Sequence, residues 1–150
     1  MSKLVKLYPH IEYNIEGNPF AAPVNDYPGL VALVRDARPN QCTLVPDSDS
    51  QKTSDHGFDL TRDFEQLAPL VQKLKELGTR VSLFVDPDPA QIKLAKKIGA
   101  DRIELYTGPF AYSFENNSVE AQHIFEQHCL AAQVAQQEGL GVNAGHDLNL

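Results

Sequence analysis

Near the end of the chain the sequence reads Gly139-Leu-Gly-Val-Asn-Ala-Gly-His146, where a short apolar strand runs into an asparagine, a glycine and a histidine. Four earlier stretches follow the same plan, because each is a brief β-rich run that turns polar at its far end. They cover residues 11–17, 41–47, 80–86 and 102–108. Polar groups that gather at the carboxyl ends of parallel strands are typical of βα-barrel active sites.

Helix-like segments separate these runs. The clearest one spans residues 64–77 and ends before Gly78, where a left-handed residue is favoured. Another opens with Asp88 as N-cap and Pro89 at the first helical position. This alternation predicts a parallel sheet with right-handed crossovers. We therefore expect an α/β fold, a partial (βα)8 TIM barrel of about five parallel strands alternating with four helices, as a single domain over residues 1–150.

Composition and charge restrict the classes of partner. The chain is 42% hydrophobic and carries a formal net charge of −7, so it lacks the clustered basic face that nucleic acid or an anionic membrane would need. No stretch reaches the roughly 18 apolar residues of a membrane span, and the first residues lack the apolar core of a signal peptide. Cys42 and Cys129 have no metal-ligand spacing. These features predict a cytoplasmic protein without a metal site.

The candidate chemistry lies at the strand ends. Glu16, Glu104 and His146 each sit at or just beyond the end of a strand, and two carboxylates with an imidazole are suited to proton transfer near neutral pH. Each residue alone has a structural alternative, since Glu104 could pair with a neighbouring cation and His146 could cap a turn. Asn143 and Gly145 would allow close backbone approach of an anionic ligand.

The longest polar run in the chain, residues 48–57, follows the second strand. Low-complexity sequence is one interpretation of this run. The other is a substrate-contacting loop, because barrel enzymes place such contacts in loops at the carboxyl ends of their strands. The sequence alone leaves both open.

Six motifs in order along the chain together resemble the pyridoxine 5′-phosphate synthase family. They are Tyr13-Asn-Ile-Glu16-Gly-Asn-Pro, Leu44-Val-Pro-Asp, Thr53-Ser-Asp-His-Gly, Val81-Ser-Leu-Phe-Val-Asp86, Arg102-Ile-Glu104-Leu-Tyr-Thr-Gly108 and Val142-Asn-Ala-Gly-His146. The resemblance implies a (βα)8 barrel that condenses 1-deoxy-D-xylulose 5-phosphate with 3-amino-2-oxopropyl phosphate, without metal or organic cofactor.

By position in these motifs, Glu16 resembles the family's general base and His146 its proton donor. Glu104 resembles the carboxylate that stabilises the transition state, and Thr53 resembles the loop residue that contacts the deoxyxylulose phosphate. Asp147 stands where the family has a phosphate-contacting glycine.

The resemblance leaves the family's first two strands and its last strand without counterparts in these 150 residues. Two hypotheses follow. In one, the chain has the family's activity, as a homo-oligomer or with another chain completing the barrel. In the other, it is an inactive truncated remnant that binds a sugar phosphate or associates with other chains. An unrelated phosphate-binding barrel such as an aldolase is disfavoured, because no lysine stands at a strand end.

Overall fold

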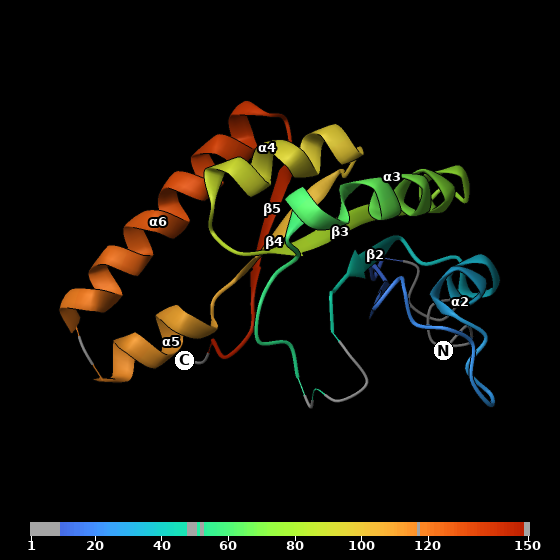
Figure 1. Ribbon diagram of the computed structural model, residues 1–150, viewed down its shortest axis with the longest axis horizontal. Coiled ribbons are helices and arrows are strands. Elements are labelled where there is room, and N and C mark those ends of the chain that lie inside the picture. Colours follow the sequence, from blue (N-terminus) through green and yellow to red (C-terminus); the bar gives the residue numbers. More distant parts are fainter. Residues whose placement is uncertain (1–9, 48–50, 52, 117, 149–150) are drawn as a thin grey trace.

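The protein is described by a computed structural model that covers residues 10–47, 51, 53–116 and 118–148. Its described part forms one sheet whose five strands follow sequence order, and each adjacent pair is parallel. The strands are β1 (Asn14–Gly17), β2 (Gln41–Leu44), β3 (Arg80–Val85), β4 (Arg102–Tyr106) and β5 (Gly141–Gly145). The helices are α2 (Leu30–Ala37), α3 (Leu60–Glu76), α4 (Pro89–Ile98), α5 (Gly108–Asn116) and α6 (Ser118–Gln137). The predicted α/β fold, a partial (βα)8 barrel, is confirmed (Figure 1).

The helix boundaries agree with the predicted ones except in two places. Helix α3 begins at Leu60, four residues earlier than predicted, because the Asp59 carboxylate accepts hydrogen bonds from the first free amides of the helix. Helix α5 was not predicted, so the described residues hold five helices rather than four. The predicted cap of α4 is present, since the Asp88 side chain accepts from the Ala90 amide with Pro89 in the first turn.

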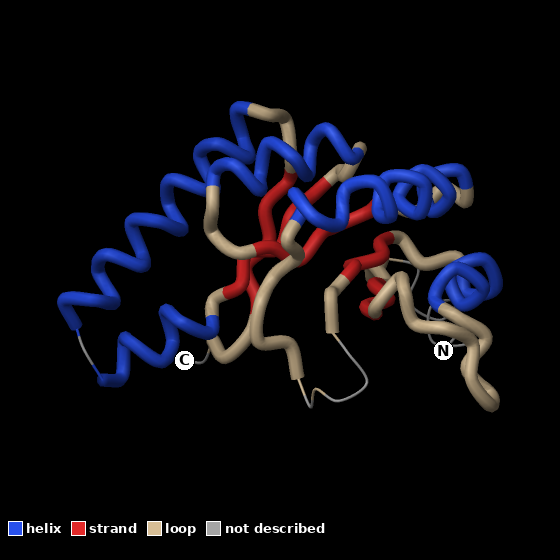
Figure 2. Tube along the Cα trace, in the orientation of Figure 1, coloured by secondary structure: helices blue, strands red, loops and turns tan. Residues whose placement is uncertain are grey.

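The strands alternate between two chemically different faces. One face is apolar and packs against α3, α4 and α6, which Figures 1 and 2 show stacked on one side of the sheet. Its buried side chains are Cys42, Leu44, Val81, Leu83, Val85, Ile103 and Leu105. This layer is the hydrophobic core, and its burial supplies the main stabilisation of the fold.

The opposite face is polar and would look into a barrel. Its side chains bond across the strands, since Thr43 Oγ1 donates to Asn14 Oδ1 at 3.1 Å and Arg80 Nε donates to Gln41 Oε1 at 2.8 Å. Farther along the sheet, the same face carries Arg102 and Glu104 on β4. Polar side chains thus line the inner face from the start of the strands toward their carboxyl ends.

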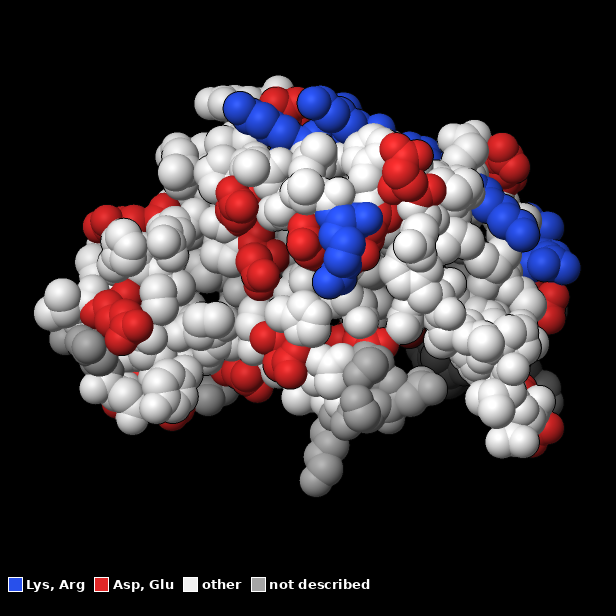
Figure 3. All heavy atoms as spheres, in the orientation of Figure 1, with Lys and Arg blue, Asp and Glu red and all other residues white. Residues whose placement is uncertain are grey.

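Charge is distributed unevenly over the surface. On the face that Figure 3 shows, lysine and arginine lie mainly along the upper rim over the helices, while aspartate and glutamate are spread below them. The α4 lysines Lys93, Lys96 and Lys97 are solvent-exposed, as their helical spacing indicates. Within the described ranges, no helix has both the length and the apolar character needed to cross a membrane.

Shortening a side chain should change the free energy of unfolding by different amounts on the two faces of β3. Leu83 is fully buried in the core, so Leu83→Ala should lower the free energy of unfolding by about 2 to 5 kcal/mol. Its neighbour Ser82 is the matched control, because its hydroxyl is buried on the polar face without a hydrogen-bond partner in the described part of the chain. Ser82→Ala should change the same quantity by less than about 1 kcal/mol. Urea unfolding followed by circular dichroism measures both, and equal losses would contradict this division.

Candidate active site

Glu16 of β1 and Glu104 of β4 lie on the inner face and interact electrostatically, although two strands separate them in the sheet. Burial raises the pKa of Glu104, and the negative charge of Glu16 raises it further. Burial also raises the pKa of Glu16, with Asp47 adding to the rise and His146 opposing it. The sheet thus brings the three predicted acid–base residues within electrostatic reach of one another.

Asn143 and Gly145 both serve the Glu104 carboxylate in this structure. Asn143 is the strand partner of Glu104 on β5, and its side chain hydrogen-bonds the carboxylate and lowers its pKa against the effect of burial. A Cβ on Gly145 would collide with the carboxylate, so this glycine leaves the space that Glu104 fills. The anion contact expected of these two residues stays a prediction.

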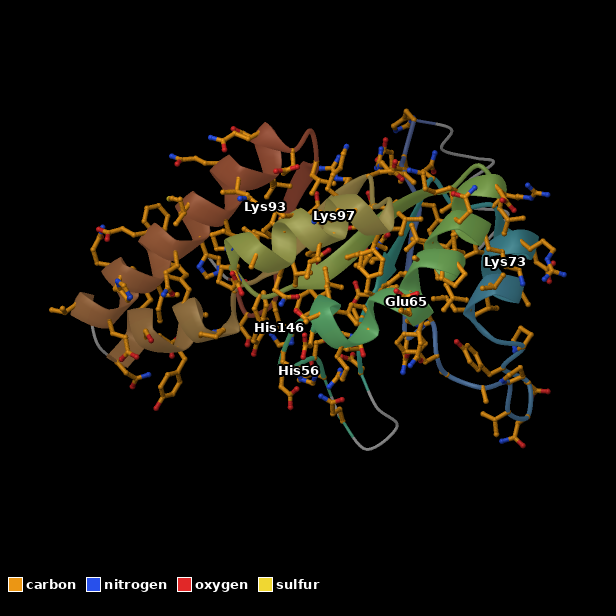
Figure 4. All side chains as sticks on the ribbon, turned by 45° about the horizontal axis from the view of Figure 1, so that its top comes forward. His56, Glu65, Lys73, Lys93, Lys97 and His146 are labelled. Carbon is orange, nitrogen blue, oxygen red and sulfur yellow. The ribbon has the colours of Figure 1, made fainter. Side chains whose placement is uncertain are left out.

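His146 follows β5 directly and has a left-handed backbone with φ of 86°. Its Nε2 lies 2.8 Å from Thr53 Oγ1, within hydrogen-bond distance. Its buried Nδ1 lies 2.8 Å from Asp147 Oδ2, a contact that does not have the geometry of a hydrogen bond. The Tyr106 ring meets the imidazole edge to face at 5.3 Å. Figure 4 shows His146 near His56 and away from the labelled lysines, and 18% of its side chain is exposed.

The polar loop after β2 is packed against the site over its described residues. Phe58 N donates to Phe84 O, and Gly57 N donates to Asp86 Oδ1 at 3.1 Å. A Cβ at Gly57 would overlap the backbone of Val85 and Asp86, so only glycine allows this approach. These contacts hold the loop against the end of β3, and the same loop places Thr53 beside His146. They favour the substrate-loop interpretation. Residues 48–50 and 52 of this run lie outside the described residues.

Asp47 follows β2 and lies within electrostatic reach of Glu16. One of its carboxylate oxygens accepts from Ser54 Oγ at 2.8 Å. The other oxygen is buried and has no hydrogen-bond partner within the described ranges. Its charge raises the pKa of Glu16. In the sequence, Asp47 stands out only as part of the Leu44-Val-Pro-Asp motif, and its position shortly after β2 was the available signal.

Thr107 is a second residue that sequence analysis missed. Its buried hydroxyl lies 2.6 Å from Gly145 O and 2.5 Å from His146 O, so its single proton is shared between the Gly145 carbonyl and the carbonyl of His146 itself. The Thr107 amide also donates to Gly145 O. Thr107 therefore fixes the strained turn that aims the imidazole. The signal was weak, because a threonine at a strand end is common.

The described residues contain no group of three His, Cys, Asp or Glu side chains arranged to hold a metal ion. The two glutamates with raised pKa values, together with the nearby imidazole, are suited to proton transfer. A five-stranded parallel sheet with such groups at the carboxyl ends of its strands places the chain among (βα)8-barrel proteins.

Comparison with known proteins identifies the family. The family model described as pyridoxal phosphate biosynthesis protein PdxJ matches residues 1–150. The pyridoxine 5′-phosphate synthase of Xanthomonas axonopodis pv. citri is 56% identical over 93% of this chain and 54% of its own length. That of Xylella fastidiosa is 52% identical over 93% of this chain and 53% of its own length. The chain belongs to the PdxJ family, and it spans about half the length of the curated relatives it matches.

A solved structure agrees on the fold. The crystal structure of methylornithine synthase (PylB) superposes with a TM-score of 0.51 at 18% sequence identity. The superposition covers 94% of this chain and 46% of that protein. This likeness supports the arrangement of strands and helices alone.

Removing the Thr107 hydroxyl should misplace His146 without unfolding the chain. In Thr107→Val, the His146 ring should move relative to Tyr106, so its NMR Cε1–H signal, assigned with His146→Asn, should shift or broaden. Any turnover should fall about 10-fold or more, because small displacements of catalytic groups are costly. Thr107→Ser keeps the hydroxyl and should preserve both. An unchanged His146 signal in a folded Thr107→Val protein would disprove this role.

Proposed function

We propose that this chain supplies the acid–base half of a pyridoxine 5′-phosphate synthase site. That site condenses 1-deoxy-D-xylulose 5-phosphate with 3-amino-2-oxopropyl phosphate to pyridoxine 5′-phosphate, with release of inorganic phosphate and water. The observation that carries the proposal is that two inner-face carboxyl groups have pKa values raised by burial, with the charge of Glu16 acting on Glu104 and that of His146 acting on Glu16. Forming the ring through imine formation, dehydration and enolisation requires protons to move on and off carbon and oxygen. Carboxyl groups whose pKa values are raised by burial and by a neighbouring negative charge are suited to that work.

Each residue has a role that fits its surroundings. Glu16 acts as the general base, because burial and Asp47 raise its pKa and so strengthen the carboxylate as a proton acceptor. His146 acts as the proton donor, with Nε2 facing the mouth beside Thr53. Glu104 carries a negative charge beneath the reacting centre and stabilises positive charge that develops there.

Thr53 contacts the deoxyxylulose phosphate in this proposal. Its side chain is exposed at the tip of the loop and already meets His146, so a bound substrate would lie between loop and imidazole. Asn143 and Gly145 hold Glu104 and present the β5 backbone to the anionic substrate. We expect no metal or organic cofactor to take part, because additions to carbonyls, eliminations of water and phosphate, and proton transfers involve no change of overall oxidation state and can be driven by general acids and bases.

The proposal also includes a partner for the sheet. Strands β1 and β5 each have a single neighbour among the described strands, so each leaves one edge available for pairing. The inner face is polar and carries Ser82 and Arg102 atoms that are buried without partners within the described ranges. We expect a second copy of the chain, or another chain that contributes strands, to cover this face.

The direct test is an assay of the purified chain with both phosphorylated substrates. Pyridoxine 5′-phosphate is followed by its absorbance, and Glu16→Gln and His146→Asn should each lower turnover by about 100-fold or more. Glu12→Gln is the matched control, because Glu12 precedes the same strand but pairs with Arg80 outside the mouth. That variant should keep turnover within about twofold.

Two results would decide against the proposal. A folded chain without turnover, alone or mixed with a longer family member, would favour the alternative that it only binds a sugar phosphate or associates with other chains. Turnover that survives both substitutions at Glu16 and His146 would show that these groups do not carry the chemistry.

A further inference from the structure

Arg102 lies at the start of β4 on the inner face, two residues before Glu104. Its Nη2 donates to Asn143 Oδ1 at 2.7 Å and to Val142 O at 3.3 Å. The guanidinium lies across Gly141, where an added Cβ would come within 3.1 Å of its Nε and Cζ atoms. Glycine at this position of β5 therefore leaves room for the arginine to reach Asn143.

The contact with Arg102 determines which end of the Asn143 side-chain amide, the oxygen or the NH2 group, faces the guanidinium. A guanidinium has only donors, so the amide oxygen must face it. The amide NH2 group is then left for the opposite side, where Glu104 lies as the strand partner of Asn143. The hydrogen bond from Asn143 lowers the pKa of Glu104, whereas burial and Glu16 raise it. With the amide reversed, an oxygen would face the carboxylate and repel it.

Stability alone does not explain the arginine. Its Nε is buried and has no hydrogen-bond partner in the described part of the chain, which is a cost rather than a gain. Arg80 is the main cause of the lowered pKa of the exposed Glu12, and the charge of Arg102 makes only the smallest contribution there. The interaction that remains to explain its place is the short bond to Asn143.

We infer that Arg102 is a positioning residue, which holds the Asn143 amide so that its NH2 group stays aimed at the Glu104 carboxylate. The catalytic meaning of this relay rests on the proposed function, while the relay itself is a structural claim. The charge that acts on Glu104 from another element is that of Glu16 on β1. Arg102 and Tyr106 lie two residues before and after Glu104 on the same face of β4, and His146 follows the adjacent strand β5. Over the described ranges, the hydrogen bond to the Asn143 oxygen comes from Arg102.

The test measures the titration midpoint of Glu104 by NMR of glutamate side-chain carboxyl carbons, with the signal assigned by Glu104→Gln. Arg102→Met should raise the midpoint by about one pH unit, because the amide is freed to rotate and its donor is lost. Arg80→Met is the matched control. Arg80 opens the adjacent strand on the same face, but it bonds Gln41 and Glu12 instead of Asn143. It should leave the midpoint unchanged.

A second variant separates the relay from a direct effect of the arginine's charge. Asn143→Leu should raise the midpoint by a similar amount, and the double variant with Arg102→Met should add nothing further. Additive shifts, or an unshifted midpoint in folded Arg102→Met or Asn143→Leu, would overturn the inference. The titration needs no turnover, so an inactive chain with the expected shifts refutes the proposed function alone. An active chain without them refutes the relay alone.

Discussion

The repulsion between two partly buried carboxylates is the constraint on which the rest of the site depends. Glu16 and Glu104 project from strands that are not neighbours, yet the charge of one raises the pKa of the other. A sheet gains no stability from such a pair, since burial and like charge both oppose ionisation. The surrounding residues limit the cost: Asn143 donates to Glu104, and the imidazole of His146 lowers the pKa of Glu16.

The sheet can carry this unfavourable pair because its two faces have separate tasks. The apolar face is covered by α3, α4 and α6 and contains the buried core (Figure 1). The polar face contributes little to that core and is free to hold arginine, amide and carboxylate groups in register. Backbone contacts at the strand ends then set the direction of the reactive groups, as Thr107 does for His146. Core packing and site geometry are thus determined on opposite sides of the same strands.

Much of the fold was predictable from the sequence, because period-two strands, capping residues and glycine stops are local signals. The capped start of α4 at Asp88 and Pro89 is an example. Helix α5 was missed because its aromatic residues show no clear stripe: Tyr112 and Phe114 are exposed while Phe110 packs on Phe125. The six sequence motifs resembled one barrel family. The family match and the parallel sheet both agree with that resemblance.

The candidate site was predictable only in part. Strand ends indicated that Glu16, Glu104 and His146 would share one edge. Glu104 instead lies in the middle of β4, with electrostatic contact to Glu16, and Glu16 has electrostatic contact with His146, while their roles stay proposals. The residues that orient them were not visible, since Arg102 reaches Asn143 across 41 positions of sequence and Thr107 bonds carbonyls 38 and 39 positions away. Such contacts depend on strand register, which a single sequence does not specify.

Coupling between the two carboxylates is the central claim, and one titration tests it most directly. The midpoint of Glu104 would be compared in the natural chain, in Glu16→Gln and in Glu12→Gln, by carboxyl-carbon NMR. Removing the charge of Glu16 should lower the Glu104 midpoint, because that charge raises its pKa, whereas Glu12→Gln should leave it in place. An identical Glu104 midpoint in all three proteins would show that the carboxylates do not sense each other and that the proposed site is not a single unit.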